Sequence, residues 1–86
     1  MNIKQQNVGT VTHYYDKIGV AVAKLKKGDI KKGDDINLID KDGNEFIQHV
    51  SSMQIEHADI DIAKSGDEFG IKVDKPVKEG TNITKS

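Results

Sequence analysis

The sequence predicts an all-β fold, a small closed antiparallel β-barrel of about six or seven short strands. Three observations predict it. Apolar and polar residues alternate in several short runs, glycine-containing turns separate these runs, and no segment carries the period of a long helix. A closed barrel is favoured over an open sheet because closure removes the exposed edges that a thin sheet would present.

Four segments carry the strand pattern most clearly. Val8–Tyr15 is rich in β-branched and aromatic residues, so we expect it to form the first strand. Val20–Ala23 and Ile36–Leu38 are shorter runs of the same kind. Glu68–Val73 places its large apolar residues at every second position, which is typical of a strand with one buried face.

The segment from Phe46 to Ile55 breaks the alternation. Phe46 and Val50 fall on one face of an extended chain, whereas Ile47, Met53 and Ile55 fall on the other. A β-bulge at the two serines after Val50 would bring Val50 and Met53 to the same side of one bent strand. Two separate short strands that meet at a kink are the alternative.

Turns and one short helical candidate separate the strands. Ala58–Ala63 is the helical candidate, and it is long enough for one turn at most. The Asp-Gly pair within Lys41–Asn44 predicts a hairpin turn, because glycine tolerates the positive φ that such a turn requires. Further turns are expected at Lys26–Asp29, Lys31–Asp34, Ser65–Asp67 and Glu79–Thr81.

Length and composition limit the possible classes of protein. At 86 residues the chain is predicted to be a single domain over 1–86, and its 35% of hydrophobic residues leave no volume for a deep cofactor pocket. We therefore expect no cofactor. The chain has no cysteine, which excludes disulfides, thiolate metal sites and cysteine nucleophiles. No apolar run reaches the roughly 18 residues of a membrane span and no secretory signal is seen, so we expect a soluble cytoplasmic protein without a membrane partner.

The charges limit the possible partners. All 13 basic residues are lysines, against 14 acidic residues, for a formal net charge of −1. That balance argues against a generic nucleic-acid coat, and the lack of arginine removes the side chain best suited to bidentate phosphate recognition. Lysines nevertheless gather between Lys17 and Lys32, directly after Tyr14 and Tyr15, and basic residues beside aromatic ones can bind a nucleic-acid backbone. Solvated charged hairpins explain the same pattern, so both interpretations stay open.

Other site motifs are incomplete. The glycine spacing of Gly28–Gly33 is that of a phosphate-binding loop, but two aspartates stand where Lys and Ser or Thr are required. A calcium-loop pattern begins at Asp40, yet its glycine comes too early and Ser51 occupies the position of the bidentate glutamate. No metal site is expected either, because only strand pairing could bring together the three histidines: His13, His49 and His57.

No catalytic set is found in the sequence. The serines and threonines lie in no nucleophile-elbow or Ser-x-x-Lys pattern, and many acidic residues lie at turns, where they usually serve solvation and capping. We therefore expect no catalytic residues and no enzymatic activity.

Two groups of motifs follow one another in an order found in a known family. Val8–Val11 opens a strand and is followed by Gly28–Asp34, a turn with isoleucine, lysine, glycine and aspartate in sequence. Val50–His57 and Ala63–Ile71 form the second group. Together they resemble the β-barrel domain 2 of translational GTPases of the elongation factor Tu and elongation factor 1-alpha type. The resemblance covers residues 6–84 and identifies the chain as a translation elongation factor-like protein without a GTPase domain.

The resemblance implies a function in protein biosynthesis. It implies a non-catalytic binding module that contacts tRNA or a ribosome-associated component, without GTPase activity. In that family the barrel contacts the aminoacyl end of tRNA, and two of its polar residues near that pocket match Gln54 and His57. With the lysines as backbone contacts, the predicted RNA-binding residues are Lys26, Lys27, Lys31, Lys32, Gln54 and His57.

An interaction with proteins is the alternative function. A similar barrel occurs as a C-terminal module on peptidase U32-type proteins, some of which act in tRNA modification. The chain would then be a protein–protein interaction adaptor that partners a tRNA-modifying or peptidase U32-type enzyme, or that self-associates. The near-neutral charge and the missing arginine favour this alternative.

Overall fold

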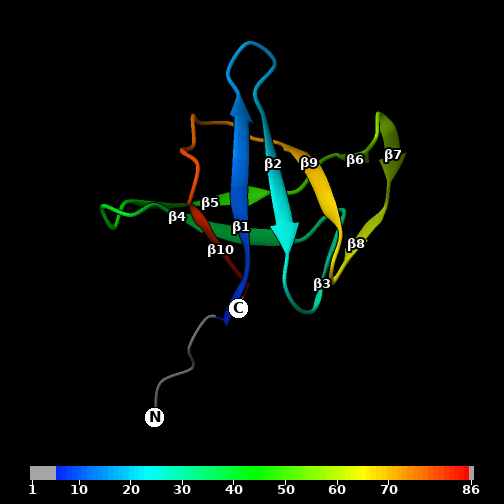
Figure 1. Cartoon of the computed structure of the whole chain (residues 1–86), viewed down its shortest axis with the longest axis horizontal. Coiled ribbons are helices and arrows are strands. Elements are labelled where there is room, and N and C mark those ends of the chain that lie inside the picture. Colours follow the sequence, from blue (N-terminus) through cyan, green and yellow to red (C-terminus); the bar gives the residue numbers. More distant parts are fainter. Residues whose placement is uncertain (1–5, 86) are drawn as a thin grey trace.

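The computed structural model describes residues 6–85, which form ten β-strands (Figure 1). The strands are β1 (Gln6–Tyr15), β2 (Val20–Leu25), β3 (Asp29–Lys31), β4 (Asp35–Ile39), β5 (Glu45–His49), β6 (Met53–Ile55), β7 (Ala58–Ile60), β8 (Ile62–Lys64), β9 (Glu68–Lys72) and β10 (Asn82–Lys85). Eight of them form one antiparallel sheet in the order β5-β4-β10-β1-β2-β9-β6-β7, and β3 pairs with β8 in a separate ribbon. The all-β prediction is therefore confirmed.

The large sheet curls into a half-barrel and does not close, so the expected closed barrel is wrong. Among the described residues, β5 pairs only with β4 and β7 only with β6. The chain leaves β5 at Val50, whose N–H donates to the Asp34 carbonyl (2.9 Å) and whose carbonyl accepts from Gly33 N–H (2.7 Å). These bonds hold the end of β5 against the turn after β3, and the β3–β8 ribbon lies where a closed barrel would need continuous strands.

The core lies on the concave face of the curl. Strand residues alternate between this face and solvent, as the period-two pattern predicts. In β2, for example, Ala21 and Ala23 are buried while Val20 and Val22 are only partly covered. The largest fully buried side chains come from seven strands and the segment after β5: Phe69, Leu25, Ile30, Ile36, Leu38, Met53, Ile71, Ile83, Val11 and Val50.

The central strand β1 bends at two irregularities. Its register shifts between Asn7 and Gly9 where it pairs with β10, and between Val11 and His13 where it pairs with β2. Such bulges bend a strand and increase its twist. At Gly9 the chain also approaches β2 closely, because an added Cβ would lie 2.6 Å from the carbonyl oxygen of Lys24. Gly9 is therefore required for this curvature.

Two turns with the same Lys-x-Gly-Asp pattern follow the two strands of the ribbon. After β3, Asp34 Oδ2 accepts the backbone N–H of Lys31 (2.9 Å), and after β8, Asp67 Oδ2 accepts that of Lys64 (2.9 Å). Each aspartate N–H donates in return to the carbonyl of the same lysine, at 3.0 Å and 2.9 Å. The N–H of Lys31 and then the ammonium of Lys85 hold the pKa of Asp34 below its ordinary value.

Two sequence predictions for short segments have clear outcomes. The helical candidate Ala58–Ala63 is wrong, because these residues form β7 and β8 and pair with β6 and β3. Their apolar residues alternate, which is a strand pattern over a segment too short for a stable helix. Phe46–Ile55 forms two separate strands, β5 and β6, which confirms the alternative to a single bulged strand.

We expect Gly9→Ala to destabilise the protein by about 2 kcal/mol, because the new methyl group would collide with a backbone carbonyl rather than a mobile side chain. Gly70→Ala in β9 is the matched control, since the tight contact of its Cβ would be with a side-chain carbon, Val20 Cγ1, at 3.1 Å, and the nearest backbone atom, the Gln54 carbonyl oxygen, lies 3.9 Å away. Chemical unfolding of both variants measures the two costs. Equal costs would show that the contact at Gly9 does not constrain the fold.

We expect Asp34→Asn to remove part of the dependence of stability on acidic pH. The pKa of Asp34 is lowered in the folded state, so its contribution is complete above the unfolded value of about 3.9 and is lost as pH falls through the folded value. The variant should be less stable than wild type at pH 7 and should differ less at pH 2. Urea unfolding at both values measures this, with Asp16→Asn in the β1–β2 turn as the control. A constant difference at the two pH values would contradict the assignment.

Candidate functional site

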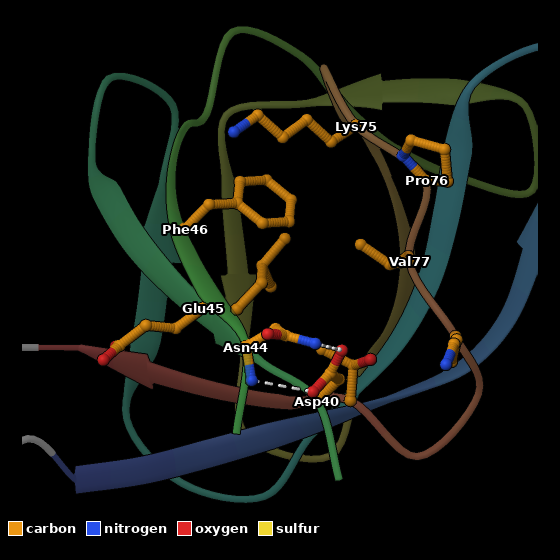
Figure 2. Close-up of a pocket in the computed structure, with 10 residues that line it drawn as sticks. Asp40, Asn44, Glu45, Phe46, Lys75, Pro76 and Val77 are labelled. Carbon is orange, nitrogen blue, oxygen red and sulfur yellow. Dashed lines mark hydrogen bonds between the residues drawn. The ribbon is translucent and has the colours of Figure 1, made fainter. Parts of the chain in front are cut away.

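The β4–β5 hairpin and residues 75–81 enclose a cavity of about 240 Å³, which we call the hairpin pocket (Figure 2). Figure 2 shows Phe46 from β5 and Val77 from the opposite segment pointing toward one another into this pocket. The lining combines four apolar side chains with charged and polar ones: Leu38, Phe46, Pro76, Val77, Asp40, Asn44, Glu45, Lys75, Lys78 and Thr81. Polar and charged residues therefore outnumber apolar ones in this lining, whereas small-ligand sites are lined mainly by apolar side chains.

Asp40 builds the hairpin side of this pocket. Its Oδ1 accepts the backbone N–H groups of Asp42 and Asn44, both at 2.9 Å, and its Oδ2 accepts the Asn44 side-chain amide at 3.3 Å. Desolvation raises the pKa of Asp40, but the bonds from Asn44 and Asp42 outweigh it and hold the pKa below its ordinary value. The carboxylate therefore serves mainly to order the turn.

The opposite side is attached to β5 through buried Gln48. The Gln48 side-chain oxygen accepts the backbone N–H of Asp74 (2.8 Å), and its amide nitrogen lies 3.4 Å from Asp74 Oδ2. The next residue, Lys75, places its ammonium 5.3 Å from the centre of the Phe46 ring. These contacts fix the segment that covers the pocket.

Thr81 is the unusual polar residue of the hairpin pocket. The residue is 98% buried, since its exposed fraction is 2%, and its hydroxyl oxygen has no hydrogen-bond partner among the described residues. A buried hydroxyl without a partner lowers stability, because it has lost its bonds to water. Rotation about χ1 would exchange its methyl group and hydroxyl within the wall of the pocket.

A second hollow of about 300 Å³ lies on the convex face of the sheet, and we call it the sheet groove. Val20, Val22 and Gly70 belong to its floor, where the missing side chain of Gly70 leaves space between β2 and β6. Exposed Tyr15 and Ile18 also line it. Its remaining residues are Gln54, Glu56, His57, Glu68 and Phe69, and a smaller adjoining hollow adds Ser52 and Lys72.

The predicted residues Gln54 and His57 meet in the sheet groove. Gln54 donates to Asp59 across the β6–β7 pair (3.1 Å). Glu56 and His57 form the turn between these strands with φ values of 51° and 69°, in the left-handed region that non-glycine residues seldom adopt. This strained turn presents His57 at the side of the groove.

The four lysines predicted to bind RNA lie away from the sheet groove, around the β3–β8 ribbon. Lys26 and Lys27 follow β2, Lys31 ends β3 and Lys32 lies in the next turn, all with exposed side chains. None of them lines the sheet groove. The structure therefore does not unite the predicted residues in one pocket, and their role in RNA binding stays untested.

The histidines also lie apart from one another. His13 lies 3.3 Å from Glu79 and His49 lies 2.8 Å from Asp35, while His57 is in the β6–β7 turn. Over residues 6–85, no group of three or more metal-ligating side chains comes together. The same range contains no helix of the length and apolarity that a membrane crossing requires.

Sequence patterns alone reveal neither the apolar part of the sheet groove nor the hairpin pocket. Ile18 carried a signal, because it is a large apolar residue between two predicted strands, Val8–Tyr15 and Val20–Ala23. No sequence signal marks the hairpin pocket, because its two walls come from segments far apart in the chain. Asp40 and Val77, which line opposite walls, are separated by more than thirty residues. Only the fold brings such segments together.

Comparisons with known proteins give the chain its context. No family model matches it. An uncharacterized protease of Methanocaldococcus jannaschii is 40% identical over 76 residues, which make up 88% of this chain and 18% of that protease. The chain thus spans less than a fifth of the curated relative that it matches.

Solved structures share the fold. The C-terminal domain of a protein named as a U32 peptidase of Geobacillus thermoleovorans superposes with a TM-score of 0.85 in its selenomethionine variant, at 20% identity over 93% of this chain and 99% of that one. A second structure of the same domain gives 0.82 at 18% identity, covering 92% and 91% of the two chains. At such low identity these structures show the fold alone.

These comparisons correct the identification as a translation elongation factor-like protein. The similar proteins are a protease and the C-terminal domain of a U32 peptidase, not domain 2 of an elongation factor. The assignment to translation and protein biosynthesis is therefore wrong, and nothing supports tRNA or a ribosomal component as the partner. The alternative, which names a U32-type enzyme, agrees with the comparisons.

We expect Thr81→Val to stabilise the protein by about 1 kcal/mol, because it keeps the shape of the side chain and removes a buried hydroxyl without a partner. Thr84→Val is the matched control. Thr84 is also buried but has an interaction partner, so its replacement should destabilise the protein. Thermal unfolding measures both changes. A loss of stability in Thr81→Val would mean that the hydroxyl is paired in solution.

Proposed function

We propose that this chain is a non-catalytic binding domain that acts as an adaptor for a U32-type peptidase. The observation that carries the proposal is the 40% identity to a protease of which the chain spans only 18%. The matched segment is thus a small part of the larger protein. The structural likeness to a U32 peptidase C-terminal domain supports the same interpretation.

The sheet groove is the docking surface in this proposal. Tyr15 and Ile18 have exposed fractions of 50% and 57%, which are large for apolar side chains of their size. Protein interfaces combine an aromatic and apolar centre with a polar rim. The groove has this composition, because Val20 and Val22 lie between Tyr15 and polar residues such as Gln54.

Tyr15 is also held in place for binding. Its ring centre lies 4.4 Å from that of His13, and its strand pairs with Val20 of β2. An aromatic side chain that is already ordered loses little conformational entropy when it meets a partner. Tyr15 is therefore well suited to be an anchor at the edge of the groove.

The proposal assigns no catalysis to this chain. The exposed glutamates Glu56 and Glu68 are instead placed to pair with basic residues of a partner.

We expect the purified chain to bind a U32-type peptidase that lacks its own corresponding segment, and to hydrolyse no fluorescent casein by itself. Ile18→Asp should weaken binding at least tenfold, because burying an isoleucine contributes about 2 kcal/mol and the aspartate would lose its hydration. Isothermal titration calorimetry measures the affinity. The matched control is Ile47→Asp, at another exposed isoleucine, on β5.

Two results would contradict the proposal. One is that the chain does not bind the truncated peptidase, although scanning calorimetry shows that both proteins are folded. The other is an equal loss of affinity in Ile18→Asp and Ile47→Asp, which would place the interface outside the sheet groove. Casein hydrolysis by the chain alone would overturn its non-catalytic role.

A further inference from the structure

The edge strand β5 carries an exposed apolar residue at its centre. β5 ends the strand order of the large sheet and has one neighbour, β4. Ile47, the middle of its five residues, has an exposed fraction of 69%, the highest of the large hydrophobic residues that are exposed. An unprotected strand edge with an apolar centre is a template for pairing with another strand.

The hydrogen bonds of the β4–β5 hairpin show which peptide groups of β5 are available. Val50 N–H donates to Asp34 at one end of the hairpin, and Asp40 N–H donates to Asn44 at the other. Bonded pairs alternate along an antiparallel ladder, so Phe46 and Gln48 direct their peptide groups toward β4. The peptide groups of Glu45, Ile47 and His49 point away from β4, toward the open edge of the sheet. Within residues 6–85, the His49 carbonyl alone of these groups has a bond, from the Gln48 side-chain amide (2.9 Å), and it retains a second lone pair.

We propose that a second copy of this chain pairs along this edge, as an antiparallel β5–β5 pair centred on Ile47. The two-fold axis would pass between the two copies of Ile47, and each would meet the other. Glu45 of each copy would lie opposite His49 of the other, so the pair would contain two equivalent Glu45–His49 contacts. All three side chains are exposed and share one face of the strand, because they lie at alternate positions.

The charges are complementary in this arrangement. His49 Nδ1 lies 2.8 Å from Asp35 Oδ1 of its own chain, and in the imidazolium form, in which both ring nitrogens carry a proton, Nε2 is free to donate to a carboxylate of the second copy. Glu45 has no ion pair among the described residues and supplies that carboxylate. Opposite charges that face one another across a strand pair stabilise it, and the apolar Ile47 pair lies between them.

The other edge of the sheet is not equivalent. β7 has three residues, and its central Asp59 is exposed and accepts from Gln54 of the adjacent strand. A short strand with a central acid would place two carboxylates opposite one another in a symmetric pair, which is unfavourable. Pairing is therefore proposed for β5 alone. It uses a surface other than the sheet groove and does not rest on the proposed function.

Sedimentation equilibrium of the full chain tests the pairing, over concentrations from about 10 µM to about 1 mM, because self-association follows mass action. We expect a monomer–dimer equilibrium for the wild type, and a dissociation constant at least tenfold higher for Ile47→Lys. Ile18→Lys is the matched control and should leave the constant unchanged. Because Ile47 is exposed, Ile47→Lys should keep the dispersed amide spectrum of a folded chain and differ from the wild type only around β5, which excludes misfolding as the cause.

An NMR sample with two differently labelled copies locates the interface. We expect nuclear Overhauser effects between the ¹⁵N-labelled amide of His49 in one copy and the ¹³C-labelled side chain of Glu45 in the other. A wild-type chain that stays monomeric throughout would overturn the proposal, as would an equal effect of Ile18→Lys. Intermolecular signals from another surface would show a dimer of a different kind and would also overturn it.

Discussion

The close approach of β1 to β2 at Gly9 is the constraint on which the rest of the structure depends. With no side chain at that position, β1 bends at its bulges and the eight-stranded sheet curls around a single layer of apolar side chains. The same curl gives the convex face on which the sheet groove lies. It also turns the β4–β5 hairpin so that residues 75–81 can cover its inner side and form the hairpin pocket.

The ribbon of β3 and β8 compensates for the incomplete closure of the sheet. Its two Lys-x-Gly-Asp turns have the same hydrogen bonds and lead into β4 and β9, which belong to different halves of the sheet. Lys85 of β10 adds a contact to Asp34 at 3.0 Å and joins one of these turns to the central strands. These contacts thus connect the ribbon to the large sheet, although no strand of the ribbon pairs with a strand of that sheet.

The sequence predicts the strands with clear alternation and fails where pairing is decided by distant residues. The strand predicted at Glu68–Val73 is confirmed, because its alternation of apolar and polar residues reflects one buried face. The prediction is wrong for residues 58–63, although their apolar residues alternate, because the pattern does not show that they pair with β6 and β3 as two separate strands. Gln54 and His57 do share a hollow, but the residues that give it an apolar character, such as Tyr15 and Val22, lie on other strands. The family resemblance failed because short glycine turns of this kind recur in unrelated β-proteins.

The position of β10 controls when the protein can fold during synthesis. β10 lies between β4 and β1, so the β4–β5 hairpin has no attachment to the central strands until residues 82–85 have left the ribosome. The pairing of Gln6 with Lys85 also closes a loop of nearly the whole chain, which is entropically unfavourable and slow. A nascent chain would expose its β1–β2 hairpin and the apolar residues of β4 during this interval. The large sheet is therefore completed only after residues 82–85 have become available for pairing.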